Sequence, residues 1–242
     1  MKKYIGCSGY YYKDWKRKFY PESLPQKKWF DYYTQHFNAV EINNTFYNMP
    51  TVEKLKNWHD SAPEDFAFAI KGNRFFTHQK KLKIDEAFKD RLKEFQDLLS
   101  HLGDKTGCVL WQLPRNLKQN TEKLEAFCQL LDNHQKHVLE FRHHSWWDIR
   151  IYEILRKYKV AFCLVSTPVD LPEDPIQTAD FTYFRFHGSN EWYNHDYQED
   201  ELKRWKNKLS AMKNLTAFFA FFNNDYNANA VQNAQAFRGM LD

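Results

Sequence analysis

Short apolar runs alternate along this chain with segments of helical periodicity. The apolar runs are typical of strands that are buried on both faces. In the segments between them, apolar residues recur at spacings of three and four, as in Phe88, Leu92, Phe95, Leu99 and Leu102, which predicts amphipathic helices. We expect strands at Tyr4–Cys7, Ala39–Ile42, Phe66–Ile70, Cys108–Trp111, Val138–Phe141, Ala161–Val165, Thr182–Phe186 and Ala217–Phe222.

This alternation indicates an α/β fold with a parallel sheet and helices outside it. Eight strands in a chain of 242 residues match the size of a TIM (β/α)8 barrel, which we expect as one domain over residues 1–242. The alternative is a doubly wound open sheet, which usually carries a glycine-rich phosphate loop after its first strand. Gly6-Cys7-Ser8-Gly9 is followed by three tyrosines, so it fits that fingerprint poorly.

The sixth unit of the barrel is irregular. Pro168, Pro172 and Pro175 follow the strand that ends at Val165. Proline lacks the backbone N–H and clashes with the preceding helical turn. We therefore expect a loop or a degenerate helix in place of the sixth helix.

Nearly every predicted strand ends in polar side chains. In a TIM barrel the carboxyl ends of the strands meet at one face, which carries the functional residues. These side chains are therefore expected to converge on one polar pocket: Ser8, Glu41, Asn43, Lys71, Gln112, Glu140, Arg142, His143, Ser166, Arg185, His187, Asn223 and Asn224.

Glu41, Glu140 and His187 are the candidate catalytic residues. The two glutamates come from different strands, so they can form an acid/base pair whose pKa values are split by burial and by nearby cations. His187 can serve as a general base or a proton shuttle. The structural alternative is a network of salt bridges in which Glu140 pairs with Arg142 or Arg185.

Cations and amides at the same strand ends suit an anionic ligand. Lys71, Arg142 and Arg185 provide positive charge for a phosphate or a carboxylate, unless the two glutamates neutralise them. The other candidate substrate-binding residues are Asn43, His78, Gln112, Trp146 and Asn223.

The chain carries none of the compact metal or nucleophile motifs. His-Glu-x-x-His, Cys-x-x-Cys and Gly-x-Ser-x-Gly are all absent. A metal site built from Glu41, Glu140, His78 and His187 is chemically possible, but its ligands are scattered along the sequence. We therefore expect no metal ligands, and the sequence does not identify a cofactor.

The loop after the first strand interleaves aromatic and basic residues from Tyr10 to Tyr20. Such a loop can stack bases and hold phosphates, or it can form a lid that packs over a pocket. The loops that contain Trp147, Trp192 and Tyr193 can add aromatic walls to the same mouth.

The composition limits the kinds of partner that the protein is expected to bind. The net charge of +4 is mild for a dedicated nucleic-acid binder. No apolar run approaches the roughly 20 residues that cross a bilayer, so no membrane partner is expected. The four cysteines, Cys7, Cys108, Cys128 and Cys163, form no Cys-x-x-Cys pair and indicate reduced thiols in a cytoplasmic protein.

The chain resembles the YecE-like family, a group named as a domain of unknown function. The matching motifs run through nearly the whole length. They are Ile5-Gly6-Cys7-Ser8-Gly9-Tyr10, Val40 to Tyr47, Phe66 to Lys71, Thr77-His78, Leu110 to Pro114, Glu140 to His143, Tyr183 to Gly188 and Phe222-Asn223-Asn224. The resemblance implies a TIM barrel and supplies no activity.

The chain departs from the pattern of that family at four positions. Ser166 stands where the family usually has an aspartate, and Cys7, Tyr10 and His144 replace the usual Thr, Trp and Pro. A carboxylate role at position 166 would therefore be lost, unless Asp170 in the following loop takes it over.

Three hypotheses for function follow. The first is a hydrolase, lyase or isomerase that acts on a small anionic or sugar-phosphate-like substrate by acid/base chemistry. The second is a module that binds an anionic metabolite without turnover. The third is a metal-dependent phosphodiesterase or endonuclease acting on nucleic acid.

Overall fold

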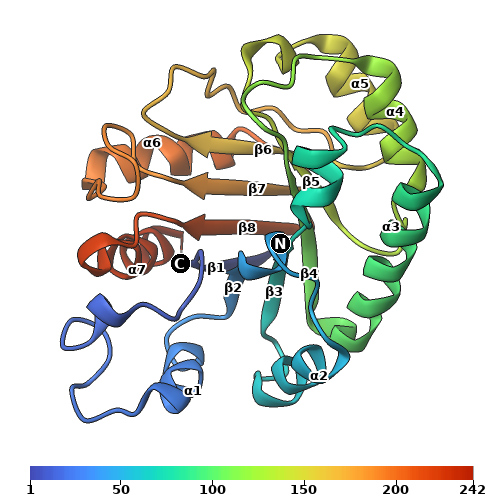
Figure 1. Ribbon diagram of the computed structural model, residues 1–242. Helices are drawn as coiled ribbons and strands as arrows, with labels where there is room; N and C mark the ends of the chain where they lie inside the picture. The colour runs from blue at the N-terminus through green and yellow to red at the C-terminus, as the bar shows by residue number, and fades with distance from the viewer. Residues whose placement is uncertain (242) are drawn as a thin grey trace.

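The computed structural model describes residues 1–241, and its strands form one closed parallel barrel in the order β1 to β8 (Figure 1). The predicted strand positions are confirmed, with small shifts at the ends. The strands are β1 (Lys2–Cys7), β2 (Ala39–Ile42), β3 (Ala67–Lys71), β4 (Thr106–Gln112), β5 (His137–Glu140), β6 (Ala161–Ser166), β7 (Phe181–Phe186) and β8 (Ala217–Phe222).

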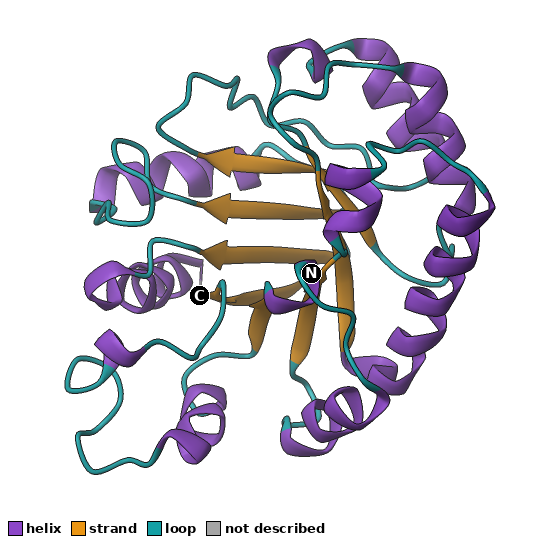
Figure 2. Cartoon of the chain, in the orientation of Figure 1, coloured by secondary structure: helices purple, strands orange, loops and turns teal. Residues whose placement is uncertain are grey.

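Within residues 1–241, seven α-helices cover the outside of the barrel (Figure 2). Each one buries an apolar stripe against the strands; α3, for example, buries Phe88, Leu92, Phe95 and Leu99, as the periodicity predicts. The helices are α1 (Trp29–Thr34), α2 (Val52–Ser61), α3 (Glu86–Leu99), α4 (Thr121–Leu130), α5 (Ile149–Lys157), α6 (Glu199–Ser210) and α7 (Asn229–Leu241). None of the described helices is long and apolar enough to cross a membrane.

The irregular sixth unit is confirmed. Residues 167–180, between β6 and β7, form an extended loop without a helix. The loop is nevertheless anchored, because Thr178 Oγ1 donates to the Val160 carbonyl at 2.7 Å and accepts from the Phe162 N–H at 2.8 Å. These two bonds satisfy backbone groups at the start of β6.

The lower interior of the barrel is filled by small side chains that face large ones. Ala39, Ala69 and Ala161 leave the room that Phe219 and Phe221 occupy, and all five side chains are buried. On β2, β5 and β7 the charged residues Glu41, Glu140 and Arg185 lie two positions nearer the carboxyl end than the buried Ala39, Val138 and Tyr183, because successive inward-facing positions are two residues apart. These buried apolar side chains therefore form the floor of the polar pocket.

Candidate active site

Three charged residues cross the interior above this floor. Arg185 on β7 donates from Nη2 to Oε1 of Glu41 at 2.6 Å and from Nη1 to Oε2 of Glu140. Glu41 comes from β2 and Glu140 from β5, and each of the three side chains is at most 1% exposed. One guanidinium therefore holds two carboxylates that are separated by 99 positions in the sequence.

Every carboxylate oxygen in this cluster has a further donor or a charged partner. Glu41 Oε2 accepts from the Tyr183 hydroxyl at 2.6 Å, and Glu41 Oε1 also accepts from Asn43 Nδ2 at 3.0 Å. Glu140 Oε1 accepts from Gln112 Nε2 at 2.9 Å and from Arg142 Nε. Such saturation is what a buried charge requires, since an unpaired one is strongly destabilising.

These contacts set the protonation states of the two glutamates. Burial by itself raises the pKa of Glu41, but Arg185 and the Tyr183 hydrogen bond outweigh it and lower the pKa below its ordinary value. Burial likewise raises the pKa of Glu140, while Arg142 and Arg185 lower it well below that value. Both carboxylates are therefore ionised at neutral pH, and neither has a proton to donate.

His187 lies beside this cluster as a neutral imidazole. Arg142 Nη2 donates to His187 Nε2 at 2.8 Å, so the ring proton is on Nδ1. The side-chain amide of Asn223 lies 3.0 Å from Nδ1 and accepts this proton when its oxygen, not its NH2 group, is turned toward the ring. Burial and the charges of Arg142 and Arg185 lower the pKa of His187 to about 3. The ring is thus locked in one tautomer and is not a cation at neutral pH.

Lys71, at the end of β3, differs from Arg142 and Arg185 in its pairing. It forms no ion pair within residues 1–241, and its ammonium lies 4.5 Å from the centre of the Phe46 ring. Burial and the nearby charge of Arg185 lower the pKa of Lys71 to about 8, although Glu140 and Glu41 oppose the shift. A substantial fraction of this amine is therefore uncharged in mildly alkaline solution.

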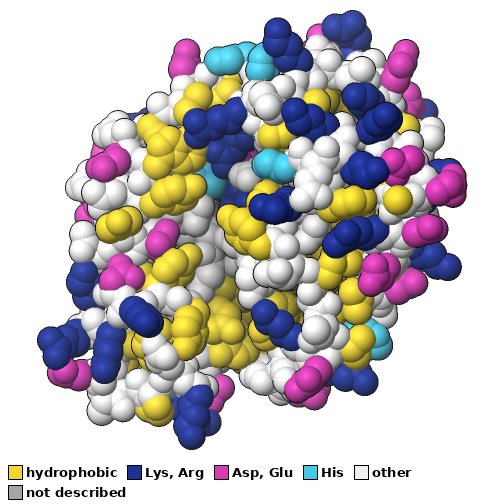
Figure 3. Space-filling view, in the orientation of Figure 1, with side chains coloured by type: hydrophobic (Ala, Val, Ile, Leu, Met, Phe, Trp, Pro, Cys, Tyr) yellow, Lys and Arg dark blue, Asp and Glu magenta, His cyan; other side chains and the backbone are white. Residues whose placement is uncertain are grey.

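A small pocket of about 200 Å³ opens above Arg142, and we call it the anion pocket. The guanidinium groups of Arg115 and Arg142 lie 4.7 and 5.2 Å from the ring centre of Trp192. Figure 3 shows a hollow where basic and histidine side chains gather beside hydrophobic ones. The pocket is lined by His78, Gln112, Leu113, Pro114, Arg115, Arg142, Trp192 and Tyr193.

Two irregular segments shape this pocket. His78 lies on a π-helical turn, Phe75–Gln79, and burial together with the charge of Lys71 lowers its pKa to about 4. On the other side, Gly188 has a φ of +104°, and a Cβ atom there would lie 2.0 Å from the Glu191 carbonyl oxygen. Glycine at this position allows the loop after β7 to fold back, with Tyr193 N–H donating to the His187 carbonyl at 2.8 Å.

The structure brings most of the predicted site residues together. One connected set of contacts contains Glu41, Asn43, Gln112, Glu140, Arg142, Arg185, His187 and Asn223. His78 lines the anion pocket, and Lys71 is close enough to the charged cluster for its pKa to be shifted by it. The anticipated pairing of Glu140 with both Arg142 and Arg185 is present.

Trp146 lies elsewhere. Its ring stacks on Phe141 with centres 4.7 Å apart, and its Nε1 donates to the Leu117 carbonyl at 2.8 Å. The residue is 1% exposed within the helix-side core, so it does not line the pocket. The Ser-Trp pair follows the end of β5, but the short helical turn at His144–Trp146 directs the indole outward.

Two residues of the site were not among the sequence candidates. Tyr183 precedes Arg185 by two positions on β7, so strand alternation could have placed it on the inner face. Arg115 follows the Leu113-Pro114 pair after β4 and carries no periodic signal of its own. Arg115 is recognised as a pocket residue only in the folded chain, where its guanidinium lies over the ring of Trp192.

Ser166 at the end of β6 belongs to a separate hydrogen-bonded chain. Its Oγ accepts from the Tyr197 hydroxyl at 2.7 Å, and that hydroxyl accepts from the Gly188 N–H at 2.8 Å. The serine therefore fixes the loop after β7, while Asp170 is exposed in the loop after β6. Within the described residues, no group of three or more His, Cys, Asp or Glu side chains is arranged to hold a metal ion.

A family model described as "Protein of unknown function DUF72" matches residues 4–242. The chain belongs to this family. The DUF72 assignment confirms the resemblance seen in the sequence motifs, and it carries no activity with it.

Individual relatives agree with the DUF72 assignment. The chain is 26% identical to the UPF0759 protein YunF of Bacillus subtilis, over 99% of this chain and 94% of that protein. A crystal structure of a DUF72 family protein from Thermotoga maritima is 30% identical and has a TM-score of 0.87, with 100% of this chain and 99% of that one covered. D-psicose 3-epimerase has the same barrel fold, at a TM-score of 0.61 and 10% identity over 99% and 98% of the two chains.

Proposed function

We propose that this DUF72 barrel is an enzyme that binds a small anionic substrate at its mouth and transfers a proton through Lys71. The observation that carries the proposal is the position of Lys71 at the end of β3, where its partly buried amine has no carboxylate partner in the described chain and desolvation lowers its pKa to about 8. General acid/base catalysis is most efficient when the pKa of the catalytic group lies near the working pH.

The charges around Lys71 support an anionic substrate. Glu41 and Glu140 are already held by Arg185, so the negative charge of the site is committed to structural ion pairs. Arg115, Arg142 and Lys71 leave net positive charge toward the anion pocket, where guanidinium groups favour a phosphate or a carboxylate. Gln112 and Asn223 provide amides that orient neighbouring groups.

In this scheme the neutral amine of Lys71 takes a proton from a carbon next to a carbonyl group. The carbanion that remains is an enolate, whose oxygen is stabilised by the adjacent guanidinium groups. The protonated amine exchanges its protons with water, so return of a proton to the same carbon incorporates solvent hydrogen. Delivery to the neighbouring carbon, with the hydroxyl proton of the first carbon passing to the enolate oxygen, isomerises the substrate. The earlier prediction that Glu41, Glu140 and His187 transfer protons stays a prediction, but their low pKa values make them weaker bases than Lys71.

The test is incorporation of solvent deuterium into phosphorylated ketoses, followed by proton NMR in D2O. We expect exchange by the wild type, with a rate that rises with pH through about 8 as Lys71 loses its proton. Lys71→Met should abolish exchange, and Lys136→Met, at the opposite end of the barrel, should leave it unchanged.

Two outcomes would replace the proposal with its alternatives. Tight binding of phosphate with no exchange in any ketose phosphate would favour a binding module for an anionic metabolite. A stoichiometric divalent metal, found by elemental mass spectrometry and required for phosphodiester cleavage, would favour the nuclease hypothesis.

A further inference from the structure

A second cavity, of about 440 Å³, lies at the barrel mouth beside β1 and β2, and we call it the tyrosine pocket. Three consecutive tyrosines and Trp58 form its aromatic walls. Its complete lining is Ser8, Gly9, Tyr10, Tyr11, Tyr12, Ile42, Asn43, Asn44, Lys54 and Trp58. The loop that carries the tyrosines is held by its own core, since Trp15 and Tyr20 are fully buried and Tyr20 stacks on Trp29 at 4.5 Å.

Two residues that line this cavity each carry a buried polar atom that has no hydrogen-bond partner within residues 1–241. These atoms are Ser8 Oγ, on a residue that is 1% exposed, and Asn43 Oδ1. A buried acceptor or hydroxyl that stays unpaired costs roughly 1–3 kcal/mol, so native structures rarely leave two in one place. Because Ser8 and Asn43 line the same cavity, a ligand bound there can supply the missing partners.

The orientation of Asn43 is fixed by the charged cluster. Asn43 Nδ2 donates to Glu41 Oε1, which is ionised, so a flipped amide would place oxygen against a carboxylate. Oδ1 must therefore face away from Glu41 and can only accept a hydrogen bond. A ligand that satisfies it carries a hydroxyl or an N–H group.

The tyrosine pocket is adjacent to Lys71. In the barrel register Cys7 pairs with Val40, and Ile42 pairs with Ile70. The next positions therefore place Ser8 beside Glu41, and Asn43 beside Lys71. Lys71 thus lies between the tyrosine pocket on one side and Gln112 of the anion pocket on the other, in the strand order β2, β3, β4.

We infer that the tyrosine pocket binds a hydroxylated, sugar-like part of the same substrate, with its hydroxyl groups on Ser8 Oγ and Asn43 Oδ1. Aromatic walls fit the C–H face of such a group, while the two polar atoms bind its hydroxyl edge. The anionic part then extends past Lys71 toward Arg142. This inference rests on the proposed function and narrows its substrate class to sugar phosphates.

The experiment is isothermal titration calorimetry at low ionic strength with inorganic phosphate, glycerol 3-phosphate, ribose 5-phosphate and fructose 6-phosphate. We expect at least one of the two sugar phosphates to bind about tenfold more tightly than inorganic phosphate, because one satisfied hydrogen bond is worth about that factor. Ser8→Ala should remove most of this advantage and leave the affinity for inorganic phosphate unchanged.

Thr182→Val is the matched control. Thr182 Oγ1 is also a buried hydroxyl with no partner in the described part of the chain, but it does not line the tyrosine pocket. Both variants remove an unpaired hydroxyl, so both should be at least as stable as the wild type in urea. Only Ser8→Ala should weaken sugar-phosphate binding.

The outcomes separate the two proposals. If neither sugar phosphate binds more tightly than inorganic phosphate, or if Ser8→Ala leaves that advantage intact, the sugar-binding inference is overturned while the anion site stands. If the wild type binds none of the four ligands, the proposed function itself fails. Equal losses in Ser8→Ala and Thr182→Val would assign the effect to stability and would also overturn the inference.

Discussion

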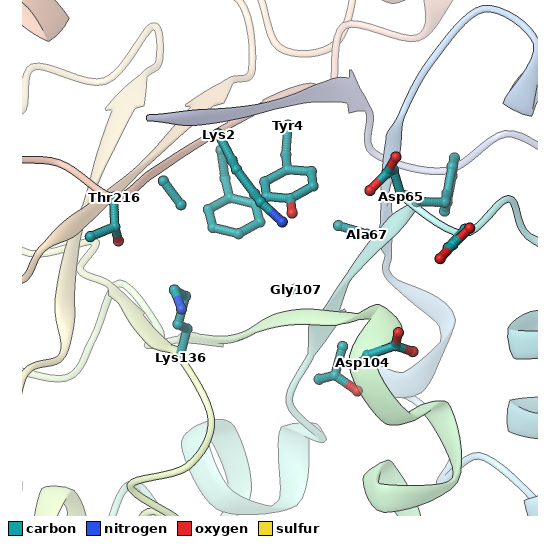
Figure 4. A pocket seen from close by; sticks show the side chains of 13 residues that line it. Lys2, Tyr4, Asp65, Ala67, Asp104, Gly107, Lys136 and Thr216 are labelled. Carbon is teal, nitrogen blue, oxygen red and sulfur yellow. The ribbon is translucent and has the colours of Figure 1, made fainter.

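The two ends of this barrel carry charge in opposite ways. At the carboxyl end, Glu41, Glu140 and Arg185 are buried and paired within the barrel. At the amino end, a hollow of about 510 Å³ is bordered by Lys2 and Lys136 across from Asp65 and Asp104, all of them exposed (Figure 4). This hollow is larger than either the tyrosine pocket or the anion pocket at the carboxyl end, yet its charges face water.

This difference shows why volume is a poor guide to the chemistry of a barrel. Exposed charges are screened by water and salt, and their pairing contributes little. Buried charges interact strongly, shift the pKa of neighbours such as Lys71 and His187, and must be held by specific partners. At the carboxyl end, buried charges therefore shift the pKa values of neighbouring groups.

The largest effect should follow from breaking the buried cluster. Glu140→Gln leaves Arg185 and Arg142 without their shared counter-charge, and we expect a loss of about 3–5 kcal/mol in the free energy of unfolding. Urea denaturation followed by circular dichroism measures this loss. Asp65→Asn at the amino end is the control and should change stability by less than about 0.5 kcal/mol. Equal losses of stability at the two ends would contradict the idea that only the carboxyl-end charges are strongly coupled.

A smaller effect is expected from Tyr183→Phe. The substitution keeps the ring in the interior but removes the hydroxyl that donates to Glu41, a hydrogen bond to a charged group worth about 1.5–3 kcal/mol. Differential scanning calorimetry should show a lower Tm with an unchanged fold. An unaltered Tm would mean that Arg185 and Asn43 alone satisfy the carboxylate.

The buried groups also predict how stability depends on pH. His187 and Glu140 both have a pKa that is lower in the folded state than in the unfolded chain, so the unfolded state binds more protons as the pH falls. Stability should therefore be fully present above about pH 6.5 and decline as the pH falls toward about 3. Urea titrations at a series of pH values measure the slope, which His187→Asn should reduce between pH 6.5 and 4.5.

The smallest effect is expected at the amino end itself. Lys2→Gln and Lys136→Gln should each leave the affinity for inorganic phosphate within about twofold, because exposed lysines hold single anions weakly. Arg142→Gln should instead weaken it about tenfold or more, since a charged hydrogen bond is lost. Titration calorimetry compares the three variants under one condition. A larger loss in the lysine variants would relocate the anion site to the hollow at the amino end.

The sequence by itself determined the layout of the barrel. The order of strands and helices, the helix missing after β6 and the row of polar strand ends all depend on local periodicity, on proline and on the two-residue alternation of strands. Glu41, Lys71, Glu140, Arg142, Arg185 and His187 could be assigned to one mouth because parallel strands in a barrel share a direction.

Only the tertiary structure decided which of these residues pair. The contact of Arg185 with both Glu41 and Glu140 depends on closure of the barrel, which brings β2, β5 and β7 across one interior. The same closure leaves Lys71 without a carboxylate partner in the described chain and brings Ser8 and Asn43, each with an unpaired buried atom, to one cavity. Which side chains pair depends on their distance and burial in the folded chain, and the local sequence determines neither.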